Sequence, residues 1–374
     1  MKFTVINIDW YKSTFIFYLS IILGCYLITV LAKRKRILFA RNLGIYTYVW
    51  SFLVTIILLF VKGFGTTGRD LRSGYYYNFL SATSLKEFHD QSIEIGYRIL
   101  NVVVYFISNK YWFFVFIVSL LTVYPVIKVI NKYSNKLDIP VAILMYTSIF
   151  FVNGFSPLRM ALAATLALYA FDAMVENKPL KALCWIIIGS CFHITVLILI
   201  IPYFFSMAKN FDRKMIILSL IIFFIAVYFG RNNITLFMSE SERYYLYSNF
   251  EHIHIGLEQF VYYIPLFLLF FYGQKNDNDR QFARVSFSYI AMGLFCGLLG
   301  YIISIFGRLQ ALFLPLVIII PYYCKLYKER FPKKKKLLNF LVLFYCIARF
   351  VIYITQYYNL EDLMPYTNIF GWII

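Results

Sequence analysis

Charged residues are scarce in this sequence of 374 residues. Asp, Glu, Lys and Arg together make up 14% of the chain, and hydrophobic residues make up 61%. Soluble domains carry about 25% charged residues, and a soluble fold of this length has too little interior to hide so much apolar surface. The composition therefore excludes an ordinary soluble protein and indicates a polytopic membrane protein.

Other absences narrow the chemistry further. The chain has four His and six Cys and contains neither a CxxC nor an HExxH motif, so no metal site is expected. None of the cysteines falls in a long outer loop, so no disulfide framework is implied. The first apolar run is followed at once by basic residues instead of a cleavage site, and we expect no cleavable signal peptide.

Ten apolar runs are candidate membrane-spanning helices, because a span needs about 20 mostly apolar residues. They lie at 13–32, 43–61, 111–127, 139–153, 158–175, 214–230, 259–273, 285–306, 309–324 and 337–357. The run 182–206 is too long for one simple span, and 99–108 is too short to cross. We expect an all-α polytopic helical bundle with about 11–12 transmembrane segments, forming a single membrane domain over residues 1–374.

Positive charge is concentrated in alternate connections between these runs. The connections 33–41, 128–138, 176–181, 207–214, 274–284 and 325–336 hold 23 basic and 6 acidic residues, whereas the rest of the chain holds 13 basic and 12 acidic. Cytoplasmic loops are enriched in Lys and Arg. The net charge of +18 is therefore explained by membrane topology, not by nucleic-acid binding, and both termini are expected on the outer side.

The same orientation rule makes two further predictions. Residues 62–110 become one long outer segment, in which 99–108 lies at the interface or dips in and returns, and residues 231–257 become an outer loop. The run 182–206 has to enter the membrane and return, with its turn near Cys191, Phe192 and His193. Non-helical backbone at that depth is tolerated only where protein or a wet cavity covers it, which makes His193 a candidate functional residue.

Ionisable side chains at membrane depth cost about 2.5–3.5 kcal/mol each on insertion scales, and they tend to face cavities or pathways. In the predicted topology most of them fall on the outer side. They are Arg69, Asp70, Arg72, Glu94, Arg98, Arg159, His193, Arg231, Glu251, His252, His254 and Arg308. Arg binds phosphate oxygens bidentately, and a carboxylate or His beside a hydroxyl can act as general base. The outer face thus holds the groups needed for a reaction on a pyrophosphate-linked lipid.

Plainer interpretations stay open for these residues. Arg159 and Arg308 begin spans and fit snorkelling anchors, and His193 fits a packing histidine. The tyrosines at 75–77 suit stacking on sugars but are also common at membrane interfaces.

The two outer carboxylates have an ordinary interpretation as well. Asp70 is next to Arg69, and Glu94 is four residues before Arg98. Each carboxylate therefore fits a local pair with its neighbouring arginine.

Several short strings, in this order, carry a family resemblance. Phe155-Ser-Pro-Leu-Arg159-Met-Ala-Leu-Ala163 is followed about thirty residues later by Gly189-Ser-Cys-Phe192-His193. Upstream stand Gly68-Arg69-Asp70 with Tyr75-Tyr76-Tyr77, and then Glu94-Ile-Gly96-Tyr97. Gly307-Arg308 and Met364-Pro365-Tyr366 come near the end. Together they resemble the motifs of EpsG/Wzy-type polysaccharide polymerases, well over residues 60–210 and loosely over the C-terminal third.

The chain departs from that family's pattern at two positions. Ile95 stands where Pro is usual, and Met160 stands where Gln is usual after the Arg. Neither change removes a proposed reactive group, but the second puts a binding role of that Gln in doubt.

The resemblance implies an enzyme of the bacterial cytoplasmic membrane. It would join oligosaccharide repeat units carried on undecaprenyl pyrophosphate into a capsule, O-antigen or exopolysaccharide at the outer face. Its fold would be a helical bundle of the GT-C-like glycosyltransferase type. The pyrophosphate linkage supplies the energy, so no metal, nucleotide or other cofactor is implied, in agreement with the lack of a Gly-rich phosphate loop. Flippase and chain-length regulator proteins are the partners that the resemblance implies.

The resemblance also implies a role for each site residue. Pyrophosphate binding falls to Arg159, Arg308, Arg69 and Arg98, sugar binding to Tyr75, Tyr76 and Tyr77, and proton transfer to Glu94, Asp70 and His193. Either Glu94 or Asp70 would be the general base, with His193 as a competing base or an orienting donor.

Three other classes of function remain as alternatives. A flippase for lipid-linked sugars would also use Arg and His in a central cavity, although its usual internal repeats are not seen in the sequence. A membrane acyltransferase that decorates surface sugars would use a buried His as base. A structural subunit of an envelope assembly would need no site.

Overall fold

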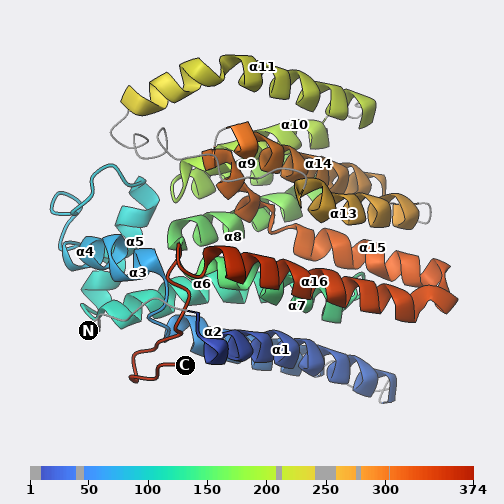
Figure 1. Ribbon diagram of the computed structural model, residues 1–374, viewed down its shortest axis with the longest axis horizontal. Coiled ribbons are helices and arrows are strands. Elements are labelled where there is room, and N and C mark those ends of the chain that lie inside the picture. The colour runs from blue at the N-terminus through green and yellow to red at the C-terminus, as the bar shows by residue number, and fades with distance from the viewer. Residues whose placement is uncertain (1–9, 39–45, 208–212, 241–257, 275–278, 303) are drawn as a thin grey trace. The chain divides into compact units, whose positions relative to one another are not determined.

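The computed structural model describes residues 10–38, 46–207, 213–240, 258–274, 279–302 and 304–374 (Figure 1). Within these residues the regular structure is helical, and the only strand-like pairings are isolated bridges between Gly65 and Asn368 and between Thr367 and Ile373. Six of the described helices are long and apolar enough to cross a membrane, or seven if one bent pair counts as a span. The predicted all-α polytopic bundle is confirmed.

Several apolar helices are shorter than the predicted membrane spans. Five further apolar helices in the described residues have only 10–17 residues; they are Val49–Gly63, Ile95–Ile107, Ile139–Gly154, Pro179–Ser190 and Ile194–Met207. A straight span needs about 20 residues. The total of 11–12 segments and the GT-C-like relation therefore stay predictions.

The chain divides into two compact units, the first formed by residues 1–165 and 331–374 and the second by residues 166–330. The elements of the first unit are α1 (Lys12–Leu38), α2 (Tyr46–Gly63), α3 (Arg69–Arg72), α4 (Gly74–Leu80), α5 (Ile95–Ile107), α6 (Tyr111–Lys132), α7 (Ile139–Met145), the π-helix η1 (Tyr146–Phe151), the 3-10 helices η2 (Val152–Gly154) and η5 (Pro332–Lys334), and α16 (Lys335–Tyr357). Helix α2 packs between α1 and α6, and α7 with η1 packs on α1 and α16.

Helix α8 (Leu158–Val175) coincides with the predicted span 158–175. Its start is favoured by Pro157, which precedes the first helical residue and is already restricted to a helix-compatible φ. Its end is closed by Asn177, whose φ of 55° is left-handed, and by a hydrogen bond from Lys178 N to Ala173 O of 2.9 Å. This is the usual way in which a helix stops and its last carbonyls are satisfied.

The second unit contains two short packed helices over the run 182–206. After α8 its elements are α9 (Pro179–Ser190), η3 (Ile194–Leu199), α10 (Ile200–Met207), α11 (Arg213–Glu240), α13 (Glu258–Gln274), α14 (Arg280–Ile302), the 3-10 segment η4 (Ser304–Phe313) and α15 (Leu316–Arg330). Helices α9 and α10 pack against each other, and Val196 Cγ1 lies only 3.0 Å from where a Cβ on Gly189 would be. The break between them at residues 191–193 is where the charge pattern predicted it.

Two sequence-based boundaries are wrong. Helix α11 does not end at Gly230 but continues to Glu240, so Arg231 and the first ten residues of the segment 231–257 are helical. The run 309–324 is not one straight helix, because residues 307–313 and 316–330 meet at a bend of 59°. Glu251, His252 and His254 lie outside the described residues.

Candidate functional site

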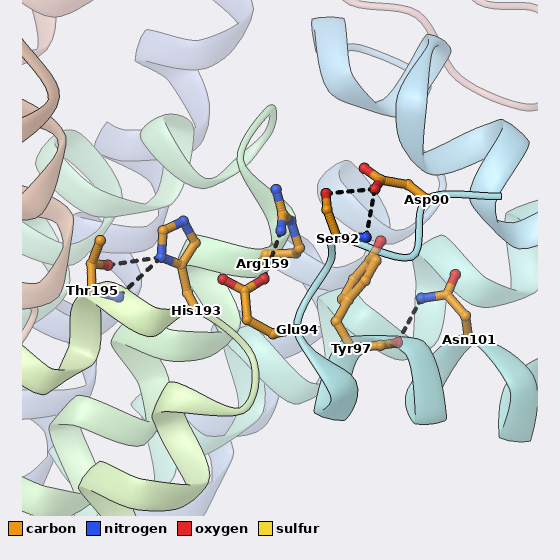
Figure 2. A network of polar contacts seen from close by, with 8 residues as sticks. All are labelled: Asp90, Ser92, Glu94, Tyr97, Asn101, Arg159, His193 and Thr195. Atoms are coloured by element: carbon orange, nitrogen blue, oxygen red, sulfur yellow. Dashed lines mark hydrogen bonds and ion pairs between the residues drawn. The ribbon is translucent and has the colours of Figure 1, made fainter. Parts of the chain in front are cut away.

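The clearest charge pair of the first unit joins residues 65 positions apart. Glu94 is the residue that precedes α5, and its carbonyl accepts from Tyr97 N and Arg98 N at 3.1 and 3.2 Å. Arg159 is the second residue of α8. Arg159 Nη1 lies 2.7 Å from Glu94 Oε2, with 23% of the arginine side chain and 7% of the glutamate side chain exposed (Figure 2). Two helix starts thus bring a largely covered cation and anion together.

Two tyrosines cover this ion pair. Tyr75 on α4 is buried, and its ring centroid lies 5.4 Å from that of the buried Tyr97 on α5. Burial raises the pKa of Tyr75 to about 12, with the charge of Asp70 adding to the rise and that of Arg159 opposing it. Burial likewise raises the pKa of Tyr97 well above its usual value. Both phenols are therefore protonated at neutral pH and act as neutral hydroxyls.

The neighbouring tyrosines differ from Tyr75 in exposure. Tyr77 is exposed, and Tyr76 packs edge-on against Tyr111 with their centroids 5.1 Å apart. Of the three predicted sugar-binding residues, Tyr75 is thus the one placed beside Arg159, and Tyr77 is the one open to the surroundings.

Asp70 is carried by the short helix α3, which rests on the turn before α8. Asp70 N lies 3.4 Å from Ser156 Oγ. Gly68 has a φ of 119°, and a Cβ there would lie 2.8 Å from Phe155 O. Only glycine therefore allows these two segments of the backbone to approach so closely. The turn that leads into Arg159 thereby also fixes the place of Asp70, whereas the side chain of the adjacent Arg69 points to an exposed surface.

Arg98 does not take the partner that its sequence position suggested. Its guanidinium donates to Gln91 Oε1, while Glu94 pairs with Arg159. The local pairing of Glu94 with Arg98 that the sequence left open is therefore wrong. Asp90 Oδ1 accepts from Ser92 N and Ser92 Oγ at 2.9 and 2.6 Å (Figure 2), and this turn leads the chain into Glu94.

Some buried polar atoms around the ion pair have no hydrogen-bond partner among the described residues. They are Arg159 Nε, Arg98 Nε and Asn78 Oδ1. Buried polar groups are nearly always satisfied in folded proteins. The unused Nε of Arg159 is such an exception within the ion pair itself.

A second set of contacts fastens the chain end to the start of the outer segment. We call it the C-terminal clasp: residues 361–374 bound to residues 61–72. Thr66 N donates to Thr367 O at 2.7 Å, and Gly68 N and Arg69 N donate to the carbonyls of residues 362 and 361 at 3.1 and 3.0 Å. Arg72 donates from Nε to Thr66 O and from Nη2 to Thr367 Oγ1 at 3.0 and 3.1 Å. The clasp holds the segment of the chain that carries Asp70.

Lys62 is a buried cation that the sequence analysis did not single out. It lies in the last turn of α2 and is 4% exposed. Its Nζ lies 3.3 Å from Thr122 Oγ1, and a Cβ at Gly154 would come within 2.9 Å of it. The apolar run 43–61 ends one residue before Lys62. An exposed anchor would stand at the same edge of an apolar helix, so the position of Lys62 alone did not distinguish a buried lysine from an exposed one.

His193 and Arg308 belong to the second unit. His193 is the cap residue of η3, and its Nδ1 lies 3.4 Å from Thr195 N and 2.8 Å from Thr195 Oγ1 (Figure 2). Because Nδ1 accepts from the backbone amide, the proton of the neutral ring is placed on Nε2. Arg308 lies in the 3-10 segment η4, not at the start of a straight helix.

No group of three or more His, Cys, Asp or Glu side chains able to hold a metal ion occurs in the part of the chain that the structure describes. A model of the EpsG family matches residues 47–368. The chain belongs to the EpsG family. The match includes α2 to α16 and the clasp residues up to Asn368, so it covers the whole of the Arg159–Glu94 site.

Membership in the EpsG family indicates a polysaccharide polymerase type of function, and the apolar helices make this EpsG-family protein a multi-pass membrane protein. Searches of curated proteins and of solved structures give no match.

Proposed function

We propose that this EpsG-family protein joins oligosaccharide repeat units carried on undecaprenyl pyrophosphate, at the outer face of the bacterial cytoplasmic membrane. The observation that carries the proposal is the covered pair of Arg159 and Glu94, 2.7 Å apart. An arginine suited to phosphate lies beside a carboxylate suited to proton transfer, in a chain of the EpsG family, and this supports the proposal.

The reaction transfers a glycan from one lipid carrier to another. An acceptor sugar hydroxyl attacks the anomeric carbon of the donor glycan, and a new glycosidic C–O bond forms. The bond between that carbon and the carrier pyrophosphate breaks, the pyrophosphate leaves with the electron pair, and the hydroxyl proton passes to a base. The pyrophosphate linkage drives the step, so the proposal needs neither metal nor nucleotide.

The described contacts suggest how the roles are divided. Arg159, with an unused Nε donor, suits the donor pyrophosphate and the charge that develops on it. Glu94 and Asp70 are the candidate bases in the first unit. In the second unit the proton on Nε2 of neutral His193 suits an orienting donor better than a base, and Arg308 stays a second candidate phosphate ligand.

We propose the sugar contacts and the remaining phosphate contacts from the exposure of the side chains. Tyr77 and Tyr76 are accessible enough for stacking on a sugar, whereas Tyr75 is buried. Arg69 is exposed, and Arg98 is half-buried. Both therefore suit contacts to a glycan or phosphate that approaches the outer segment.

The test is complementation of a strain that lacks the gene, with polymer length read from extracted surface glycan. Arg159→Ala, Arg308→Ala and His193→Ala are compared with Lys86→Ala, an exposed cation on the same outer segment as Glu94. Membrane levels are measured in parallel. Exported single repeat units that stay unjoined support the proposal. Lipid-linked units trapped inside would instead show a flippase, and full-length polymer from all variants would remove these residues from the site.

A further inference from the structure

The segment that carries Arg308 is an unusual element of the second unit. The segment η4 (Ser304–Phe313) is a 3-10 helix of ten residues, whereas 3-10 runs longer than three or four residues are uncommon because their hydrogen-bond geometry is poor. A bend of 59° separates it from α15. Contacts with neighbouring helices, and not the continuation of a straight helix, therefore decide where its side chains point.

The side chains of η4 fall on three faces. A 3-10 helix has 3.0 residues per turn, so residues three apart lie above one another. Two faces are buried or half-buried, and they carry Leu309 with Leu312 and Gln310 with Phe313. The third face, which we call the open face, carries the exposed Arg308 and the half-buried Ala311. A rotation of η4 by about one third of a turn would exchange the open face for a covered one.

A side-chain hydrogen bond joins one covered face of η4 to α13. Gln310 Nε2 donates to Gln259 Oε1, and Gln259, the second residue of α13, is only 4% exposed. The bond lies against the backbone of α14, because a Cβ at Gly297 would collide with both amides. Three elements of the second unit thus meet at one pair of amides.

This bond does what apolar packing alone does not. Hydrophobic contact is non-directional, so the leucines of η4 favour burial without specifying one rotation. An amide–amide hydrogen bond is directional, and an amide that lost its partner inside a membrane protein would be costly. The bond therefore selects the rotation in which Gln310 faces α13 and Arg308 lies on a different face.

We propose that Gln259 and Gln310 are positioning residues that act through Arg308. Their hydrogen bond sets the rotation of η4 and holds the guanidinium on the open face, where it can bind a phosphate of the lipid-linked donor. This inference rests on the proposed function, in which Arg308 is a candidate phosphate ligand, and deepens it. A pair of amides suits the role because amides are uncharged and compete less with phosphate for a guanidinium than a carboxylate does.

The first measurement tests the rotation of η4 without any turnover. Ala311→Cys reports the open face and Leu309→Cys a covered face, each in a chain whose six native cysteines are replaced. Both are labelled in membranes with a water-soluble maleimide, and position 311 should react several-fold faster than position 309. Gln310→Met removes the bond but keeps an unbranched side chain that fills space. It should slow the reaction at 311 and speed the reaction at 309 several-fold.

The matched control is Gln281→Met on α14. Gln281 Nε2 donates to two backbone carbonyls, at 2.9 and 3.3 Å, so this variant also loses hydrogen bonds of a glutamine, but not at η4. It should leave both labelling rates unchanged. Equal labelling of 311 and 309 in the otherwise unchanged chain, or a pattern that Gln310→Met does not alter, would overturn the inference.

The second measurement is a double-mutant cycle on the rate of repeat-unit joining per inserted molecule. Gln310→Met and the control Gln281→Met are each made in the wild-type chain and in Arg308→Ala. We expect Gln310→Met to lower the wild-type rate toward that of Arg308→Ala and to add little further loss to Arg308→Ala, because it acts through that arginine. Loss by the same factor in both backgrounds would show a merely structural role and overturn the inference.

The outcome for the inference is separate from that for the proposed function. A joining rate that Arg308→Ala leaves unchanged would overturn the inference, since Gln259 and Gln310 would have no phosphate ligand to position. The polymer length made by Arg159→Ala would then still judge the polymerase proposal.

Discussion

Two arginines of the first unit, Arg72 and Arg159, are held by different kinds of acceptor. Arg72 donates to a backbone carbonyl and to the hydroxyl of Thr367, which are neutral. Arg159 donates to the carboxylate of Glu94. Hydrogen bonds to neutral acceptors fix the geometry of the chain around Arg72, whereas the carboxylate that accepts from Arg159 also balances the charge of the guanidinium. From this comparison we expect Arg72 to serve the fold and Arg159 to serve the proposed pyrophosphate donor.

The largest expected effect is on the Arg159 side of this comparison. Arg159→Ala should lower the rate of repeat-unit joining about 10²–10³-fold, the usual loss when one donor to a developing negative charge is removed. Polymer length per molecule of inserted protein is the measurement. Arg159→Lys keeps the charge without the fork and should recover only part of the rate. Full recovery by Lys would show that charge alone is needed and would weaken the pyrophosphate assignment.

Arg72→Ala should act on stability instead. The loss of two hydrogen bonds from a charged donor is expected to cost about 2 kcal/mol, seen as a lower Tm of the protein in detergent and a smaller amount in the membrane. The joining rate per surviving molecule should fall far less than in Arg159→Ala. Thr367→Val, which removes one acceptor and keeps the shape, is the milder companion. If Arg72→Ala abolished turnover with normal stability, the two arginines would not differ as inferred.

Lys62 extends the comparison to a third cation with a neutral partner. Gly154→Ala should destabilise the protein by about 1 kcal/mol, because its Cβ would come within 2.9 Å of Lys62 Nζ in a packed interior. Gly24→Ala, in a helix where nothing lies within 4 Å, is the matched control and should not destabilise. Combining Gly154→Ala with Lys62→Ala should relieve the crowding. The measurement is the Tm of four proteins: wild type, Gly154→Ala, Gly24→Ala and the Gly154→Ala/Lys62→Ala double variant.

The smallest expected effect concerns Asp362 in the clasp. Burial raises the pKa of Asp362, and the charges of Arg72 and Arg69 oppose the rise. A carboxyl whose pKa is higher in the folded chain stabilises the fold only below its unfolded pKa, near 4, and that contribution is lost as the pH rises through the folded value.

Asp362→Asn should therefore melt slightly higher than wild type at neutral pH, and the two proteins should melt together below about pH 4, where wild-type Asp362 is protonated. Asn also suits the left-handed backbone at this position, where φ is 49°. A stabilisation that grew toward acid pH would contradict the sign of the shift.

The sequence predicted the elements whose ends are set by local chemistry. Pro157 and Asn177 delimit α8, and the basic residues around 182–206 required a return near His193; both features are present. The end of α11 was missed because Gly230, at the change from apolar to polar residues, lies inside the helix without ending it. The bend before α15 was missed because a hydropathy pattern contains no information on the direction of the backbone.

The sequence named candidate residues for the site but did not predict their pairing. Arg159, Glu94 and Asp70 could be singled out because ionisable groups are costly near the membrane. The partner of Glu94 could not be found from spacing, since Arg98 lies four residues away and Arg159 lies 65 away. Lys62 and Arg72 were not assigned a role, because whether a cation at a helix end is exposed or buried depends on residues such as Gly154 and Thr367 that are distant in the chain.

The clasp also sets the order in which a newly made molecule becomes complete. Thr67 and Thr367 are 300 residues apart, and at about 5–20 residues per second the ribosome needs about 15–60 s to make the intervening chain. During that time α2 and α6 can already be in the membrane, while the amides of Gly68 and Arg69 still lack the acceptors that hold them. The stretch that carries Asp70 is therefore fastened last. Under the proposed function, we expect a chain still under synthesis to be inactive until translation has passed the clasp.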